Sequence, residues 1–282
     1  MNMRKRTIAA VVLSLSMLAG CAPQEPLVEP ETTVPPETVT VIRETTAPTQ
    51  APVETEAPST EATVPFEVTT IPVITTQQNS VTVTTADEFL AAIAPDTEII
   101  VDAELIDWSK AAGYGEATGE YYYWEDPFDG PQLVITGVSN LTVRGAGEDH
   151  TAHVLSAVPR YAYVLTFENC ANIHVKGLTA GHTEEPGYCC GGVLAFRNSQ
   201  DILVEDCGLF GCGTIGVMGN SCKNMQIVGN DIYDCSVGGV EFMNCDMVNV
   251  DGNTFRDLGG PIFRIYDCGT ITCNGEDAVP FQ

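Results

Sequence analysis

The residues best suited to catalysis lie together in one short stretch, His182-Thr183-Glu184-Glu185. A histidine beside carboxylates can transfer protons near neutral pH, and two carboxylates at a suitable separation can cleave a glycosidic bond. A solvated acidic loop has the same composition, however, because adjacent glutamates need not point the same way. We therefore predict His182, Glu184 and Glu185 as catalytic candidates, with a solvent-exposed loop as the alternative.

A second group of residues combines aromatic rings with carboxylates and histidines. Rings stack on the C–H faces of sugars, while carboxylates accept hydrogen bonds from hydroxyl groups or bind Ca²⁺. This pattern predicts a carbohydrate site, and the alternative is that the rings seal surface loops onto the body of the protein. The ligand-binding candidates are Trp108, Tyr122, Trp124, Asp126, His150, His153 and Tyr188.

Ca²⁺ is the one cofactor that the sequence indicates, through Asp234 and Asp257. These aspartates are separated by the same interval as Cys222 and Cys245, and they fall in register with His182 if an insertion follows that histidine. Two stacked carboxylates repel each other unless a cation or solvent lies between them. We predict a Ca²⁺ site at this pair.

These candidates must be positioned by a repeating unit, because Cys222, Cys245 and Cys268 return at a constant interval. Apolar residues return in step in two columns separated by eight residues, and each begins a short run of alternating apolar side chains. Such runs, bounded by Asn, Gly or Cys, are typical of β-strands that stack in parallel on their copies. One column is Leu133, Leu165, Leu194, Val217, Val240 and Phe263; the other is Leu141, Ile173, Ile202, Met225, Val248 and Ile271.

The intervals that exceed this constant one locate the surface loops. The steps from Leu133 to Leu165 and from Leu165 to Leu194 are both longer than the regular step from Cys222 to Cys245. If each unit has two strands, the additional residues of the longer steps fall in the one loop that joins successive units, near residues 146–157 and 183–190. The long loop over residues 107–131 falls at the same place around the axis of the solenoid. We expect these three loops to form one ridge that carries the candidate residues.

The start of the repeat carries a helix signal. Thr85 and Glu88 form a capping box, and Phe89, Leu90 and Ile93 follow at helical spacing. We predict a short helix that covers the first turn, with the first strand beginning at residue 99.

With its stacked turns and N-terminal helix, the chain resembles the right-handed parallel β-helix proteins, the superfold of pectate lyases and many bacterial surface proteins. The resemblance covers about residues 99–273 and implies an all-β right-handed parallel β-helix solenoid of about seven rungs with a short N-terminal capping helix. It leaves the activity open, since this superfold includes lyases, hydrolases, epimerases and adhesins.

The arginines do not match the pectate lyases among these proteins, which use an unpaired basic residue facing Ca²⁺. Arg197 falls beside Glu168, and Arg264 falls beside Glu241, so we expect both to form ion pairs between neighbouring turns. The Gly-His-Gly motif of β-helical polygalacturonases is also missing, and Gly181-His182-Thr183 matches it only in part.

Ten cysteines follow Cys21. In an exported domain an even number suggests disulfides, but three cysteines in one column cannot all pair. We predict a mainly reduced ladder in which thiols pack as small apolar groups.

Three segments differ in composition. Residues 1–20 form a signal peptide, and Leu18-Ala19-Gly20-Cys21 resembles a lipobox, so Cys21 is the predicted lipidation site. Residues 21–80 are rich in Thr, Pro and Glu, which predicts a disordered stalk. Residues 81–282 form the β-helix domain. The expected location is the bacterial cell envelope, with the protein lipid-anchored and facing outward.

The charge of the β-helix domain restricts its partners. Its 29 acidic and 8 basic residues give a formal charge of −21. Nucleic acid is therefore not expected as a partner, and the membrane is expected to be contacted through the lipid anchor only. Acidic polysaccharide would be repelled unless a divalent cation bridged the two.

Three functions remain open at this point. The first is a surface protein that binds, with or without processing, a carbohydrate through the loop ridge. The second is a non-catalytic scaffold or adhesin that displays loops to a protein partner, and the third is a polysaccharide lyase or hydrolase. Self-association is also left open.

Overall fold

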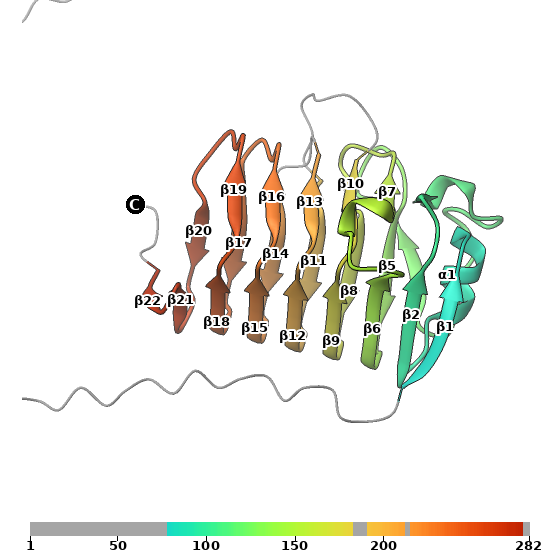
Figure 1. Ribbon diagram of the computed structural model, residues 1–282, viewed down its shortest axis with the longest axis horizontal. Coiled ribbons are helices and arrows are strands. Elements are labelled where there is room, and N and C mark those ends of the chain that lie inside the picture. Colours follow the sequence, from blue (N-terminus) through green and yellow to red (C-terminus); the bar gives the residue numbers. More distant parts are fainter. Residues whose placement is uncertain (1–77, 183–190, 212–214, 279–282) are drawn as a thin grey trace, which may run out of the picture. The chain divides into compact units, whose positions relative to one another are not determined.

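Three strands, rather than the two expected, make up each turn of the chain. The computed structural model describes residues 78–182, 191–211 and 215–278. In these residues the strands stack into three sheets that run along the solenoid, with almost every neighbouring pair parallel (Figure 1). The exceptions are the antiparallel pairs β4–β5 and β21–β22. This topology is a parallel β-helix.

The strands of each sheet come from successive turns of the chain. Sheet A contains β1 (Asn79–Val83), β2 (Thr97–Val101), β6 (Ser139–Gly145), β9 (Ala171–Lys176), β12 (Gln200–Glu205), β15 (Lys223–Val228), β18 (Asp246–Asp251), β21 (Ile271–Cys273) and β22 (Glu276–Asp277). Sheet B contains β3 (Leu105–Asp107), β7 (Val154–Ala157), β10 (Thr179–His182), β13 (Gly208–Phe210), β16 (Asp231–Tyr233) and β19 (Thr254–Arg256). Sheet C contains β4 (Tyr122–Glu125), β5 (Gln132–Thr136), β8 (Leu165–Glu168), β11 (Leu194–Arg197), β14 (Ile215–Asn220), β17 (Gly238–Met243) and β20 (Phe263–Tyr266).

The register confirms the two apolar columns. Leu194 pairs with Leu165 on one side and Val217 on the other, in sheet C. Ile202 pairs with Ile173 and Met225 in sheet A. These side chains point inward and form one continuous core with the inner residues of sheet B. Sheet B was not predicted because its strands have only three or four residues, too few for a clear alternating pattern.

A third column, of polar residues, repeats at the corner between sheets C and A, and left-handed backbone turns explain it. Asn169, Asn198, Ser221, Asn244 and Asp267 have φ values of 55°, 48°, 56°, 53° and 50°. Asn and Asp tolerate this conformation better than other residues that carry a Cβ. The column is therefore selected by backbone geometry at a corner, and it carries no information about function.

The next residue in four of these five corners is a cysteine and in the other is Ser199, and the last three cysteines form the cysteine ladder. The N–H of Cys222 lies 3.4 Å from Sγ of Cys245, and the N–H of Cys245 lies 3.3 Å from Sγ of Cys268. Seven cysteines among the described residues are free thiols, the arrangement expected of a reduced ladder. Cys189, Cys190 and Cys212 lie outside the described residues.

The predicted capping helix is α1 (Ala86–Ala92). The side chain of Thr85 accepts a hydrogen bond from the N–H of Glu88, and Phe89 is fully buried against the end of the solenoid. The carboxylate of Glu88 accepts from the N–H of Thr84, one residue earlier than the capping box implies. The first strand was wrongly predicted, because β1 precedes the helix and pairs with β2.

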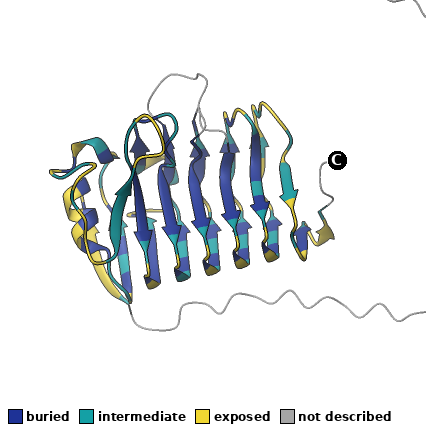
Figure 2. Ribbon diagram, turned by 180° about the vertical axis from the view of Figure 1, so that it is seen from behind, coloured by how far each residue is buried: buried dark blue, intermediate teal, exposed yellow. Residues whose placement is uncertain are grey.

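Six turns have a strand in each sheet, and sheet A has a further parallel strand at each end, close to the seven rungs expected (Figure 1). Contacts with the solenoid begin at Gln78, whose amide donates to the carbonyl of Asn140, three residues before the expected boundary at 81. Burial is densest in the central strands and decreases toward β20 (Figure 2). No helix of the described residues has the length and apolar character needed to cross a membrane.

Candidate functional site

The corner from sheet B to sheet C carries the longest insertion among the described residues and a second, shorter one. One covers residues 108–131 between β3 and β5 and includes η1 (Trp108–Lys110) and β4. The other covers residues 158–164 between β7 and β8. We refer to these two segments together as the corner ridge. Residues 183–190 follow β10 at the same corner but lie outside the described residues.

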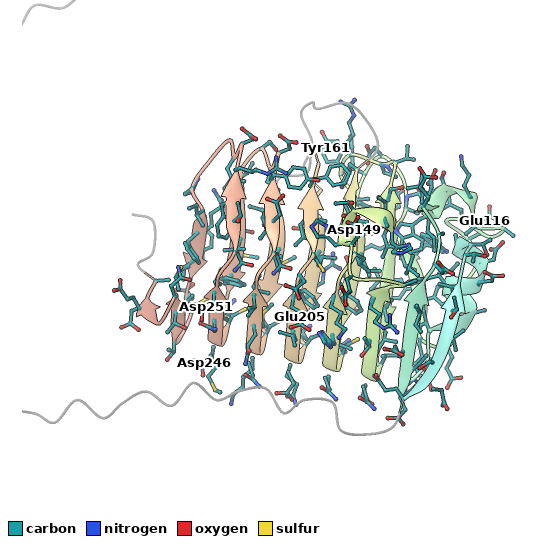
Figure 3. All side chains as sticks on the ribbon, in the orientation of Figure 1. Glu116, Asp149, Tyr161, Glu205, Asp246 and Asp251 are labelled. Atoms are coloured by element: carbon teal, nitrogen blue, oxygen red, sulfur yellow. The ribbon has the colours of Figure 1, made fainter. Side chains whose placement is uncertain are left out.

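His150 and His153 do not belong to the corner ridge, contrary to the prediction. Residues 146–153, with η2 (His150–Ala152), connect sheet A to sheet B, and Figure 3 places Asp149 of this segment apart from Tyr161 of the ridge. Nδ1 of His150 lies 3.2 Å from Oγ1 of Thr179, and Nδ1 of His153 lies 3.0 Å from the carbonyl oxygen of Ala103. The prediction failed because a turn of three strands divides its surplus residues between two corners.

Trp108, Tyr122 and Trp124 face the core. Trp108 is 1 % exposed, and its indole N–H donates to the carbonyl of Val164 at 2.7 Å. In β4, Tyr122 and Trp124 are two residues apart, so both face the core side and pack against the core. These three rings seal the insertion onto the solenoid, which was the alternative to ligand binding. The prediction is wrong for Trp108, which has almost no accessible surface.

His182 is buried at the end of β10, with 2 % of its surface exposed. Its Nε2 donates to the carbonyl of Gly192 at 3.1 Å, and its Nδ1 is buried without a partner. Burial lowers the pKa of the imidazole, although the carbonyl of Gly192 and the charge of Asp129 oppose this effect. The ring is therefore held neutral, and none of the contacts described pairs it with an acid. Glu184, Glu185 and Tyr188 lie outside the described residues.

Asp234 and Asp257 are exposed turn residues with φ of 56° and 53°. Their left-handed backbone explains why aspartate occurs there twice, as it does for the polar column between sheets C and A. Asp257 also lies 3.7 Å from the guanidinium of Arg256. Within the described ranges, no group of three or more His, Cys, Asp or Glu side chains is arranged to hold a metal.

The corner ridge instead exposes an aromatic pair that the sequence analysis missed. Phe128 is 76 % exposed, more than any other large apolar side chain described, and its ring centroid is 4.9 Å from that of Tyr161. Phe128 lies in Asp126-Pro127-Phe128-Asp129-Gly130-Pro131. Because turn-forming residues surround Phe128, its ring does not lie on the inner face of a strand. This local composition could have identified Phe128 as an exposed residue.

Asp129 holds the two segments of the ridge together. Its carboxylate accepts hydrogen bonds from the backbone N–H groups of Arg160 and Tyr161, at 2.8 and 3.1 Å. Asp126 closes its own loop by accepting from the N–H of Gly130 at 3.3 Å. The relative positions of Phe128 and Tyr161 are therefore fixed by backbone contacts of the neighbouring residues.

A groove of about 560 Å³ lies where the two segments of the ridge meet, and the sequence neighbours of the two rings, Asp129 and Arg160, line it. Its lining includes Lys110, Tyr114, Pro159 and Arg160, with Asp129 between the two segments. The hydroxyl of Tyr114 donates to the carbonyl of Pro131 at 3.2 Å, and burial, together with nearby aspartates, raises the pKa of Tyr114 to about 12. Tyr114 is thus a neutral wall of the groove.

A polar network on the outer face of sheet C supports the ridge. Glu125 accepts from the amide of Gln132 at 2.5 Å and from Arg197 at 2.8 Å. Gln132 in turn accepts from the N–H of Tyr163 at 2.7 Å. Both segments of the ridge therefore enter sheet C through the same set of hydrogen bonds.

One of the two ion pairs expected from the sequence is not formed, because Arg197 belongs to this network. Arg197 is in register with Glu168, but its guanidinium bonds to Glu125 instead. The carboxylate of Glu168 accepts from the hydroxyl of Tyr123 at 3.1 Å. The other expected pair is confirmed, with 2.7 Å between Arg264 and Glu241.

Comparisons with known proteins agree with the topology. Residues 162–277 match a family model described as a right-handed beta helix region. No curated protein compared with the chain matches it. A crystal structure of a protein from Parabacteroides merdae, provisionally described as a glycosyl hydrolase, is similar with a TM-score of 0.40 and 10% sequence identity, covering 70% of this chain and 99% of that one. A likeness this distant carries no argument about function. The described residues form an all-β right-handed parallel β-helix, the fold that the sequence predicts.

Proposed function

We propose that this protein is a lipid-anchored component of the bacterial cell envelope that binds a glycan at the corner ridge. The observation that carries the proposal is the pair Phe128–Tyr161, an exposed ring fixed beside the groove. A ring with 76 % of its surface in water remains solvated unless a ligand covers it. The C–H face of a sugar is a suitable cover, and the groove offers polar groups for its hydroxyls.

Binding is favoured over cleavage by the state of the predicted acid–base residue. General acid–base catalysis needs a group within hydrogen-bond reach of the substrate, whereas His182 is 2 % exposed and bonds to a backbone carbonyl. Asp126 and Asp129 accept hydrogen bonds from backbone N–H groups of the ridge itself. These contacts stabilise the loops that present the rings.

The location is proposed from the N-terminal segment. Cys21 would carry the lipid, and residues 21–80 would act as a stalk between the membrane and the β-helix. A stalk of this kind would let the ridge reach polymers at a distance from the anchor.

A glycan-array screen followed by calorimetry tests the function. Phe128→Ala and Tyr161→Ala should each weaken binding about tenfold, because each removes one ring contact. Tyr266→Ala is the matched control: it removes a ring that is 44% exposed in β20, away from the ridge, and should leave the affinity unchanged. Absence of glycan binding, or equal loss in all three variants, would refute the proposal and favour a scaffold for a protein partner.

A further inference from the structure

Arg160 differs from every other arginine of the described residues. The guanidinium groups of Arg144, Arg197, Arg256 and Arg264 each lie 2.7 to 2.8 Å from a carboxylate oxygen. In residues 78–182, 191–211 and 215–278, Arg160 alone among arginines has a guanidinium without an ion pair. Its hydrogen bonds are made by the backbone: its N–H donates to Asp129, and its carbonyl accepts from the N–H of Gly191.

An arginine without a carboxylate partner is unexpected in this domain, where 29 acids surround 8 bases. Asp129 lines the same groove, but the two oxygens of its carboxylate accept from the N–H groups of Arg160 and Tyr161. The backbone of the ridge therefore engages the acid, and the arginine side chain remains available to another anion.

Basic side chains outnumber acidic ones in the lining of the groove, although Asp107 and Asp126 also lie close enough to act on Tyr114. Arg160 and Lys110 line it, and Asp129 is the one acid in its described lining. Lys110 has a side chain that is 77% exposed and lies 3.6 Å from Asp107, a long and solvated ion pair. Such a pair contributes little, so the ammonium can turn toward a ligand at small cost.

We propose that the groove binds an anionic substituent of a glycan, a carboxylate or a sulfate, on the guanidinium of Arg160. This inference rests on the proposed function and specifies its ligand class. A guanidinium offers two parallel N–H donors that match either anion, and Lys110 adds a second positive charge. The rings of Phe128 and Tyr161 then pack against the sugar that carries the anion.

Binding of an anionic glycan is the opposite of what the net charge of the domain predicts. A formal charge of −21 repels anionic polymers at long range, but salt reduces that repulsion beyond about 8 Å at physiological ionic strength. Contacts within the groove are closer than this distance. The guanidinium of Arg160, which has no ion pair in the described structure, then selects the ligand at short range.

Nuclear magnetic resonance on the full chain tests the inference with three matched sugars: glucose, glucuronate and glucose 6-sulfate. We expect glucuronate, glucose 6-sulfate or both to shift the Nε–Hε signal of Arg160 saturably, while glucose does not. The two anionic sugars separate a carboxylate from a sulfate as the preferred group. Arg160→Gln should reduce the affinity for the responding sugar roughly tenfold to hundredfold.

Two variants control for fold and for general charge. Arg160→Lys keeps the charge but loses the paired donors, so it should retain part of the affinity. Lys223→Gln removes one positive charge at an exposed position of β15, remote from the ridge, and should leave binding unchanged. The guanidinium of Arg160 has no ion pair, so the melting temperature of Arg160→Gln should match that of the parent.

Three outcomes would overturn the inference. If all three sugars shift the ring signals of Tyr161 equally and Arg160→Gln has no effect, the ligand is not selected by charge, although the proposed glycan function stands. If inorganic sulfate binds as tightly as glucose 6-sulfate, the site recognises an anion and not a glycan. If no sugar perturbs Arg160 or Tyr161, the assigned ligand class is wrong, and the array result decides the proposed function separately.

Discussion

Replacing Met247 with asparagine should stabilise the protein. Met247 is the second residue of β18 and has φ of 58°. The equivalent residues of earlier turns have the same conformation and are Asn or Asp: Asn140, Asn172, Asp201 and Asn224, with φ of 58°, 56°, 56° and 56°. Their side chains form an outer ladder, in which the amide of Asn172 donates to Asn140 at 3.1 Å and that of Asn224 donates to Asp201 at 2.7 Å. Met247 ends this ladder.

The expected gain follows from two terms. A left-handed backbone costs an ordinary residue about 1 kcal/mol more than it costs asparagine. The new amide could donate to Asn224, which contributes about 0.5 to 1 kcal/mol at a partly exposed site. Loss of apolar contact by the half-buried Met247 side chain offsets about 0.5 kcal/mol. The net gain is about 1 to 1.5 kcal/mol, or roughly 4 °C in melting temperature for a domain of this size.

Thermal and urea denaturation of the full chain, followed by circular dichroism, would measure this gain. Met247→Gly relieves the backbone without adding a ladder bond, so it should be less stable than Met247→Asn. Met247→Ala keeps the backbone cost and should not exceed the parent. The reasoning is refuted if the asparagine variant is no more stable than the parent, or if the glycine variant is the more stable of the two.

Two further predictions concern buried polar groups. Because burial lowers the pKa of His182 below its unfolded value near 6.5, the unfolded chain binds more protons below that pH, and stability should fall as pH decreases, by up to about 1.4 kcal/mol per pH unit. Urea titrations between pH 7.5 and 5 should show this slope and its reduction in His182→Gln; equal slopes in the two proteins would contradict it. Asn230 is 1 % exposed, accepts from the N–H of Cys207 and donates to the carbonyl of Val204. Asn230→Leu should therefore destabilise the protein by about 2 to 4 kcal/mol. Asn224→Gly on the outer ladder, which removes one exposed bond but tolerates the left-handed backbone, should cost less than half of that, and equal losses would refute the distinction.

The sequence allowed the fold to be predicted wherever one turn repeats another. The cysteine column, the two apolar columns and the capping helix all appear as expected, because each depends on local spacing. Sheet B and β1 were missed. A strand of three residues has too few alternations to be distinguished from a turn, and β1 is exposed at four of its five positions.

The candidate site was predicted less well, because loop positions depend on which corner holds an insertion. Trp108 and His182 are residue types common in binding sites, yet both are almost fully buried and bonded to backbone carbonyls. Phe128 and Arg160 were overlooked. Phe128 stands out by its exposure, and Arg160 by its lack of an ion pair within the described structure. Neither property can be read from the spacing of residues in the sequence.

The three-stranded turn also restricts how this protein can change its length during evolution. One added residue inside a strand would exchange the inner and outer side chains beyond it, which disrupts the core. Duplication of a whole turn, by contrast, gives each new side chain the surroundings of its parent copy. The regular turns from β12 to β20 are therefore suited to gain or loss in steps of one complete turn, while new recognition loops can arise at the corners without altering the core.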